Sequence, residues 1–218
     1  MAKPASTRKI GRQIVRFTFK AVSMFGKDCF MLHGSAIAKG GKANIFLGRS
    51  NAGKTTVSLF AAHHGYEILA DELCVVDKKN LKVAPIQRGR ININPYTVKF
   101  FRESGLMKDR KYASLNAVMN KTEAIRACDI LASGMKFSDK AYPIDKIYLF
   151  QTDNAPIGDG IHELFPFYRL QSPGEREKDI RSLFRVLERR GFKVIPTLDL
   201  GNSEKRKQTH QRLRRLLK

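Results

Sequence analysis

The sequence predicts an α/β fold with a mixed β-sheet, one strand of which leads into a phosphate-binding loop. Short apolar runs of strand length alternate with segments suited to helices, and a glycine-rich loop directly follows one of these runs. Of the 218 residues, 42% are hydrophobic, which is enough for an ordinary globular core. We expect one main domain over residues 21–200, with a basic extension at 1–20 and a basic tail at 201–218.

The first half of the chain predicts mostly strands. Residues 14–24 alternate partly in hydrophobicity, and residues 29–38 form a second strand candidate. The turn signal Lys39-Gly40-Gly41-Lys42 joins that second strand to a short apolar strand at 43–47, as in a β-hairpin. The further elements expected here are a helix at 54–64, closed by Gly65, and strands at 66–70, 73–76 and 81–86.

In the second half of the chain, the sequence pattern over residues 96–140 predicts mainly helix. Strands are expected at 146–150 and 192–200. Between them, Ser172, Pro173 and Glu175 form a capping signature for a helix at 173–190. The tail at 203–218 predicts a basic amphipathic helix that either contacts a membrane or an acidic partner, or docks at the edge of the domain.

The glycine-rich loop between strand 43–47 and helix 54–64 fits the pattern Gly, four residues, Gly-Lys-Ser/Thr. Its glycines let backbone N–H groups turn inward around an anion, Lys54 adds a positive charge for the outer phosphates, and the Thr55 hydroxyl can ligate Mg²⁺. The helix that follows offers unpaired N–H groups to the same anion. The residues expected to bind a nucleotide are Gly48, Arg49, Ser50, Asn51, Ala52, Gly53, Lys54, Thr55 and Thr56.

Two carboxylates follow the next predicted strand. Asp71 lies 17 residues after Lys54, which leaves room for one helix and one strand, so the two groups are expected on neighbouring elements. Asp71, Glu72 and Thr55 are candidate ligands of Mg²⁺ bound together with ATP. Because adjacent strand residues point to opposite faces, Asp71 and Glu72 can share one metal only if the strand ends before them.

The segments His33-Gly34-Ser35-Ala36, Gly53-Lys54-Thr55 and Leu69-Ala70-Asp71-Glu72 resemble the catalytic domain of HPr kinase/phosphorylase. The P-loop core of that family resembles the one in phosphoenolpyruvate carboxykinase. The resemblance covers roughly residues 28–200. It implies a P-loop kinase core and ATP-dependent transfer of the γ-phosphoryl group to a hydroxyl, most naturally a serine of a protein or peptide.

The resemblance also implies catalytic roles. Asp71 would accept the hydroxyl proton, and His33 would orient or tune it from a nearby strand, while Lys54 would neutralise phosphate charge. Glu72 stands where the family usually has a second aspartate, and Gln87 stands where it has a glutamate.

Two arginines follow Gln87 in the region of the family's Arg-Gly signature. Arg88 and Arg90 would neutralise charge that develops on a transferred phosphoryl group, or would lie in a solvated turn. The sequence does not choose between these roles.

The net charge of +21 is concentrated at the two ends of the chain. Residues 1–20 contribute six positive charges, and residues 203–218 contribute a net six. This charge favours an anionic partner, and the main alternative to a kinase is therefore a nucleotide-dependent binding module for nucleic acid or membrane. Basic tails without a dedicated target fit equally well.

Other features of the sequence point to the cytoplasm. There is no apolar signal segment and no run long enough to span a bilayer, and the three cysteines form no CxxC pair. We therefore expect a cytoplasmic protein with reduced cysteines. The identity of the hydroxyl-bearing substrate and the presence of a homo-oligomer are left open.

Overall fold

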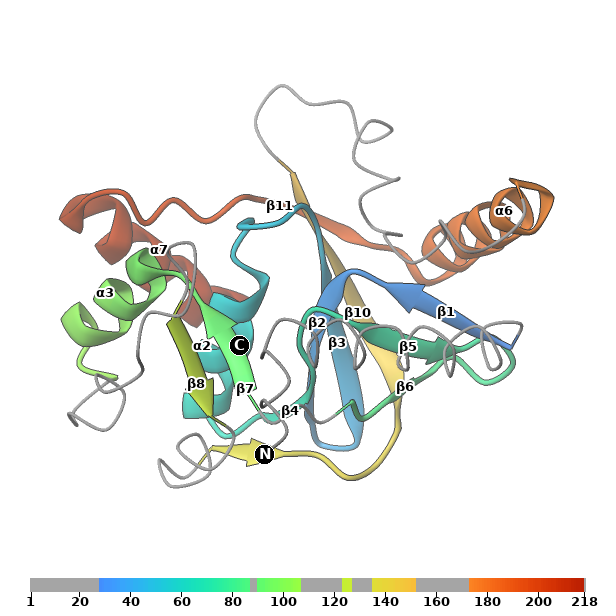
Figure 1. Cartoon of the computed structure of the whole chain (residues 1–218), viewed down its shortest axis with the longest axis horizontal. Coiled ribbons are helices and arrows are strands. Elements are labelled where there is room, and N and C mark those ends of the chain that lie inside the picture. The colour runs from blue at the N-terminus through green and yellow to red at the C-terminus, as the bar shows by residue number, and fades with distance from the viewer. Residues whose placement is uncertain (1–27, 87–89, 107–122, 127–134, 152–172, 218) are drawn as a thin grey trace, which may run out of the picture.

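The computed structural model describes residues 28–86, 90–106, 123–126, 135–151 and 173–217. These residues form a mixed α/β fold, as expected, with a nine-stranded mixed sheet and a separate two-stranded ribbon (Figure 1). The strands are β1 (Cys29–Leu32), β2 (Gly34–Lys39), β3 (Lys42–Leu47), β4 (Glu67–Ala70), β5 (Cys74–Asp77), β6 (Lys82–Ala84), β7 (Arg90–Ile93), β8 (Glu123–Arg126), β9 (Lys136–Phe137), β10 (Tyr142–Gln151) and β11 (Lys193–Pro196). The helices described are α2 (Lys54–His63), α3 (Pro95–Glu103), α6 (Pro173–Arg190) and α7 (Ser203–Leu216).

The sheet runs in the order β1-β5-β6-β10-β3-β2-β4-β9, and β11 pairs with β10. Strand β10 is parallel to β3 and β11, and β4 is parallel to β9. The remaining pairs in this sheet are antiparallel. Strand β3 therefore lies in the interior of the sheet, and the loop that follows Leu47 leaves the sheet from its middle.

The predicted hairpin joins β2 and β3. Gly40 and Gly41 have φ values of 59° and 76°, which a two-residue turn of the I′ type requires. The register pairs Lys39 with Lys42 at the turn and Gly34 with Leu47 at the far end. The hairpin thus brings the start of β2 beside the residue that precedes the glycine-rich loop.

The expectation of one continuous strand over residues 29–38 was wrong, because the strand breaks at His33. Before the break, β1 pairs with β5, whereas after it β2 pairs with β3 and β4. The two halves of the segment thus serve different neighbours, which a hydrophobicity pattern along one chain cannot show. His33 lies at the junction between them.

Two hydrophobic clusters pack against opposite faces of the sheet. Side chains alternate along the strands, so that Ile37 and Phe46 belong to one cluster and Ala36 and Ile45 to the other. The first cluster includes residues of α2, α3, α7 and β7, and these elements gather on one side in Figure 1. Helix α6 lies on the other side and contributes Leu183 to the second cluster.

The prediction of mainly helical structure over residues 96–140 was only partly right. Helix α3 ends at Glu103, and the described residues farther along form β8 and β9 instead. Residues 107–122 and 127–134 lie outside the described part. Pairing with β7 and β4 defines these two short strands, and neither partner is adjacent to them in the sequence.

The other predictions for the second half of the chain were largely confirmed. Helix α6 begins at Pro173 and the long strand β10 includes residues 146–150, whereas β11 ends at Pro196, before the predicted limit of 200. The predicted extension at 1–20 and the predicted strand at 14–24 lie outside the described residues. No helix among those described combines the length and the apolar character needed to cross a membrane.

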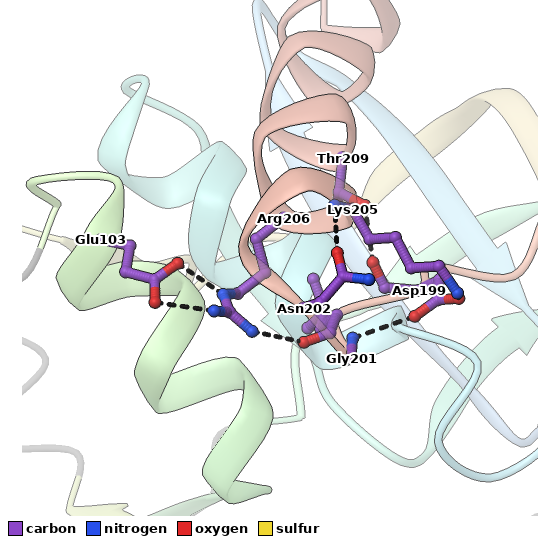
Figure 2. Close-up of polar contacts among 8 residues, drawn as sticks. Glu103, Asp199, Gly201, Asn202, Lys205, Arg206 and Thr209 are labelled. Atoms are coloured by element: carbon purple, nitrogen blue, oxygen red, sulfur yellow. Dashed lines mark hydrogen bonds and ion pairs between the residues drawn. The ribbon is translucent and has the colours of Figure 1, made fainter.

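The basic tail forms α7, which docks on the core. The Leu213 side chain is 1% exposed and lies in the same cluster as α2 and α3. Arg206, 4% exposed, donates to both carboxylate oxygens of Glu103 at 2.5 and 2.7 Å and to the carbonyl of Leu200 at 2.9 Å (Figure 2). The structure shows the docked helix, and contact of this helix with a membrane or an acidic partner stays a prediction.

We expect Arg206→Ala to lower the melting temperature by on the order of 5 °C, because it removes a buried guanidinium, two hydrogen bonds that join α7 to α3 and one to the carbonyl of Leu200. Hydrogen bonding to Arg206 lowers the pKa of Glu103 below its ordinary value of 4.5. The contribution of the pair is therefore complete above that pH and is lost as the pH falls through the folded-state pKa. Thermal melts should show a difference between wild type and variant at pH 7 that shrinks as the pH falls below 4.5.

Arg181→Ala is the matched control for this measurement. Arg181 pairs with Glu177 one turn away on α6, and both side chains are largely exposed. Exposed pairs of this kind contribute little to stability. Equal melting temperatures for the Arg206 and Arg181 variants would contradict the structural role given to Arg206.

Candidate phosphate-binding site

The glycine-rich loop connects the interior strand β3 to α2 by a compact turn. Asn51 has a φ of 64°, a left-handed conformation that asparagine tolerates better than most residues. The N–H of Ala52 donates to the carbonyl of Arg49 at 3.2 Å, and the N–H of Leu198 donates to the carbonyl of Ala52 at 3.1 Å. The loop is thus closed on itself and tied to the segment after β11.

The N-terminus of α2 has no side-chain cap. Gly53 occupies the N-cap position without a capping hydrogen bond, and the first turn contains no acidic residue. In contrast, Asn94 caps α3 and Asn202 caps α7 through side-chain oxygens. An uncapped helix start presents N–H groups and the positive end of the helix dipole, both of which favour an anion.

Lys54 is held inside the loop. Its side chain is almost buried, and Nζ donates to the carbonyl oxygens of Gly48 at 2.8 Å and Arg49 at 2.6 Å. At the same residue, the backbone carbonyl accepts a hydrogen bond of 3.0 Å from the buried hydroxyl of Ser35 on β2. Strand β2 and the loop therefore fix the position of one ammonium group beside the start of α2.

Gly53 cannot be replaced without strain. Its φ is 108°, and an added Cβ would lie 2.5 Å from Cγ of Leu198. We expect Gly53→Ala to destabilise the protein by roughly 2–4 kcal/mol, from the left-handed backbone and the steric clash together. Urea unfolding of Gly53→Ala and Gly40→Ala separates the two causes. Gly40 also has positive φ but open space around it, so its variant should lose only about 1 kcal/mol.

The predicted carboxylates lie just after the end of β4. The strand ends at Ala70, and the Asp71 carboxylate, 5% exposed, accepts a hydrogen bond of 2.9 Å from the hydroxyl of Thr55. Glu72 has a φ of 67°, outside the strand conformation. Because the strand ends before both residues, their side chains are not confined to opposite faces of the sheet.

A cavity of about 170 Å³ opens at the start of α2. Glu72 lines it, whereas Asp71 lies behind Thr55. Most of the residues that the sequence predicted for the site line this cavity, together with three that it did not predict. The lining residues are His33, Ser50, Asn51, Gly53, Lys54, Thr55, Thr56, Glu72, Ile93, Asn94 and Thr97.

His33 reaches the cavity through the break between β1 and β2. On one side of it Leu32 pairs with Cys74, and on the other side Ala36 pairs with Ala70. The segment around His33 therefore runs alongside the segment that contains Asp71 and Glu72. This arrangement brings the histidine and the two carboxylates to the same end of the loop.

Three of the lining residues were not predicted from the sequence, namely Ile93, Asn94 and Thr97. The pair Asn94-Pro95 is a recognisable helix start, but only the fold shows that this start abuts α2. There the hydroxyls of Thr56 and Thr97 are 3.0 Å apart.

The two arginines remain predictions. Arg88 lies outside the described residues. Arg90 begins β7 and pairs through its backbone with Arg126, three residues before the cavity-lining Ile93.

The Thr55–Asp71 pair fits a magnesium ion that is bound together with phosphates. Within the described ranges, no group of three or more His, Cys, Asp and Glu side chains is arranged to hold a metal. Mg²⁺ does not require such a group, because it commonly keeps several waters and takes one or two carboxylates plus phosphate oxygens. The hydroxyl of Thr55 and the carboxylate of Asp71 are oxygen ligands of the required kind.

No family model matches this chain, and no curated protein is similar enough to it to count as a match.

Proposed function

We propose that the protein is an ATP-dependent kinase with a P-loop core, which transfers the γ-phosphoryl group to a hydroxyl of a cytoplasmic protein or peptide. The observation that supports it most is the convergence of three features on one cavity. These are the enclosed ammonium of Lys54, the uncapped start of α2, and the wall formed by Glu72 and His33. Phosphoryl transfer needs this combination of charge neutralisation and positioned polar groups.

The loop would bind the phosphate chain of ATP. Backbone N–H groups at the start of α2 supply directed donors, and Lys54 supplies the charge that offsets the outer phosphates. Ser35 and the carbonyls of Gly48 and Arg49 hold the lysine and its backbone in place. Prepositioned donors of this kind stabilise developing charge without having to reorganise.

In the transfer step, the acceptor oxygen forms a bond to the γ-phosphorus while the bond from that phosphorus to the bridging β–γ oxygen breaks. ADP leaves, and the proton of the acceptor hydroxyl moves to a carboxylate. We assign that carboxylate to Asp71, which is hydrogen-bonded to Thr55 just behind the cavity wall. Glu72, which lines the cavity itself, is the alternative proton acceptor. His33 would orient the acceptor side of the cavity.

Thr55 and Asp71 are the residues that would hold Mg²⁺. When bound, the ion would neutralise charge on the β- and γ-phosphates and align them. Glu72 lines the same cavity and is the second carboxylate available to it. The buried position of Asp71 and its bond to Thr55 keep its carboxylate beside the first turn of α2.

The direct test is incubation of the purified protein with γ-labelled ATP, Mg²⁺ and a cell extract, followed by identification of the labelled species. The proposal expects label on a serine or another hydroxyl, and no label when Lys54 is replaced by Met. Equal labelling with both proteins would reject this site as the source of activity.

The alternative, a nucleotide-dependent binding module, uses the same loop and predicts a different result. It expects ATP binding without label transfer, together with RNA or DNA binding that weakens steeply as salt increases. Filter binding at two salt concentrations separates the two functions.

A further inference from the structure

The N-terminal turn of α3 forms a wall of the cavity that none of the roles above uses. Asn94 and Thr97 line this wall, and Thr97 is joined to Thr56 of α2 by a hydrogen bond of 3.0 Å between the two hydroxyls. The two helices therefore begin side by side at the same cavity. This turn and Thr55 therefore line one cavity.

The orientation of the Asn94 amide is fixed by its neighbours. Its Oδ1 accepts from the backbone N–H of Thr97 at 2.8 Å and from the Thr97 hydroxyl at 3.0 Å. A backbone N–H can only donate, so a flipped amide would set two donors against each other. Because Thr97 donates its hydroxyl proton to Asn94, Thr56 must be the donor to Thr97. The three side chains thus form one directed chain of hydrogen bonds.

Because Oδ1 is bonded to Thr97, the Nδ2 group is the end of the Asn94 side chain that can donate hydrogen bonds to a ligand. Asn94 is half-buried and lines the cavity. Among the residues that the structure describes, none accepts a hydrogen bond from this Nδ2 group. Two N–H donors are therefore held on a side chain whose other end is fixed at two points, and donors in this position suit phosphate oxygens.

We infer that Asn94 binds the terminal phosphoryl group of the nucleotide and so distinguishes ATP from ADP. This inference rests on the proposed phosphate cradle. In a loop of this type, the lysine and the hydroxyl residue after it mark the end that holds the outer phosphates. Lys54, Thr55 and Asn94 line the same cavity, so a terminal phosphoryl group held at that end of the loop lies in the cavity that Asn94 also lines. Thr97 holds Asn94 in place beside Thr56 at the start of α2.

The test compares dissociation constants for ATP and ADP in wild type, Asn94→Ser and Asn94→Asp. Serine and aspartate both cap helices well, so α3 should remain intact in each variant. We expect Asn94→Ser to weaken ATP binding about tenfold, the effect of losing one hydrogen bond to a charged group, and to leave ADP binding within twofold of wild type. Asn94→Asp should weaken ATP binding further, because it places a carboxylate against phosphate.

Asn202→Ser and Asn202→Asp are matched controls. Asn202 caps α7 by accepting from the N–H of Lys205, as Asn94 caps α3, but it does not line the cavity. These variants should bind ATP as wild type does, and the melting temperatures of the Asn94 and Asn202 variants should be similar.

The outcomes separate the inference from the proposed function. Wild type that fails to bind ATP would reject the cradle itself. Wild type that binds ATP, together with an Asn94→Ser variant that binds it equally well, would overturn the role of Asn94 alone. An equal loss of ATP and ADP affinity would also overturn it, because the contact would then not be to the terminal phosphoryl group.

Discussion

Replacement of Lys54 by Met is expected to weaken ATP binding roughly 10- to 100-fold, because a hydrogen-bonded charge is removed from the centre of the loop. Methionine keeps most of the length of the side chain and its packing, so the loss should come from the missing ammonium group. Isothermal titration calorimetry of both proteins with ATP measures the change directly. The substitution also removes the hydrogen bonds from Lys54 to two carbonyls of the loop. Thermal melts of both proteins should therefore accompany the titration, to show whether stability changes as well.

Lys39→Met is the control for the loss of a lysine. Lys39 also donates to a backbone carbonyl, that of His64 at the opposite end of α2, but its side chain is exposed and outside the cavity. We expect its ATP affinity to match that of wild type. If both variants lose affinity equally, net charge rather than the loop would account for binding.

Asp71→Asn is expected to reduce phosphoryl transfer by a factor of roughly 10²–10⁴, which is the usual contribution of a positioned general base. ATP affinity measured without Mg²⁺ should change less than tenfold, because Lys54 and the loop amides remain. Asparagine is similar in size to aspartate and can still accept the hydrogen bond from Thr55. The loss should therefore appear in the rate of transfer rather than in folding or nucleotide affinity.

Glu72→Gln is the comparison that makes this assignment specific. Glu72 lines the cavity and is the carboxylate next to Asp71 in the sequence. Glu72→Gln therefore removes one negative charge, as Asp71→Asn does, but at the adjacent position. We expect a smaller loss of transfer than in Asp71→Asn. If Glu72→Gln abolishes transfer and Asp71→Asn does not, the proton acceptor is Glu72, and Asp71 serves only to hold Thr55.

Local spacing predicted a strand, a glycine-rich turn and a helix start over this region, and the structure has them in that order. That the loop binds a nucleotide stays a prediction. The strand, the glycine positions and the start of α2 are consecutive in the chain, so a pattern over residues 43–56 contains nearly all of this part of the site. The 17 positions from Lys54 to Asp71 leave room for only one helix and one strand, so the two residues were expected on neighbouring elements. In the structure, Thr55 and Asp71 are hydrogen-bonded.

Contacts between segments that are distant in the sequence could not be predicted from local spacing. Asn94 joins the cavity because α3 packs beside α2, and the Thr56–Thr97 bond joins residues 41 positions apart. The break at His33 and the short strands β8 and β9 depend on pairing partners in other parts of the chain. The docking of α7 depends on Glu103, which no pattern within the basic tail contains.

The central claim is that the loop before α2 binds the phosphates of a nucleotide, and a calorimetric titration of the full chain with ATP and Mg²⁺ tests it most directly. We expect saturable binding of one ATP per chain, displacement by ADP, and strong weakening in Lys54→Met. No binding at millimolar ATP, or binding that is unchanged in Lys54→Met, would contradict it.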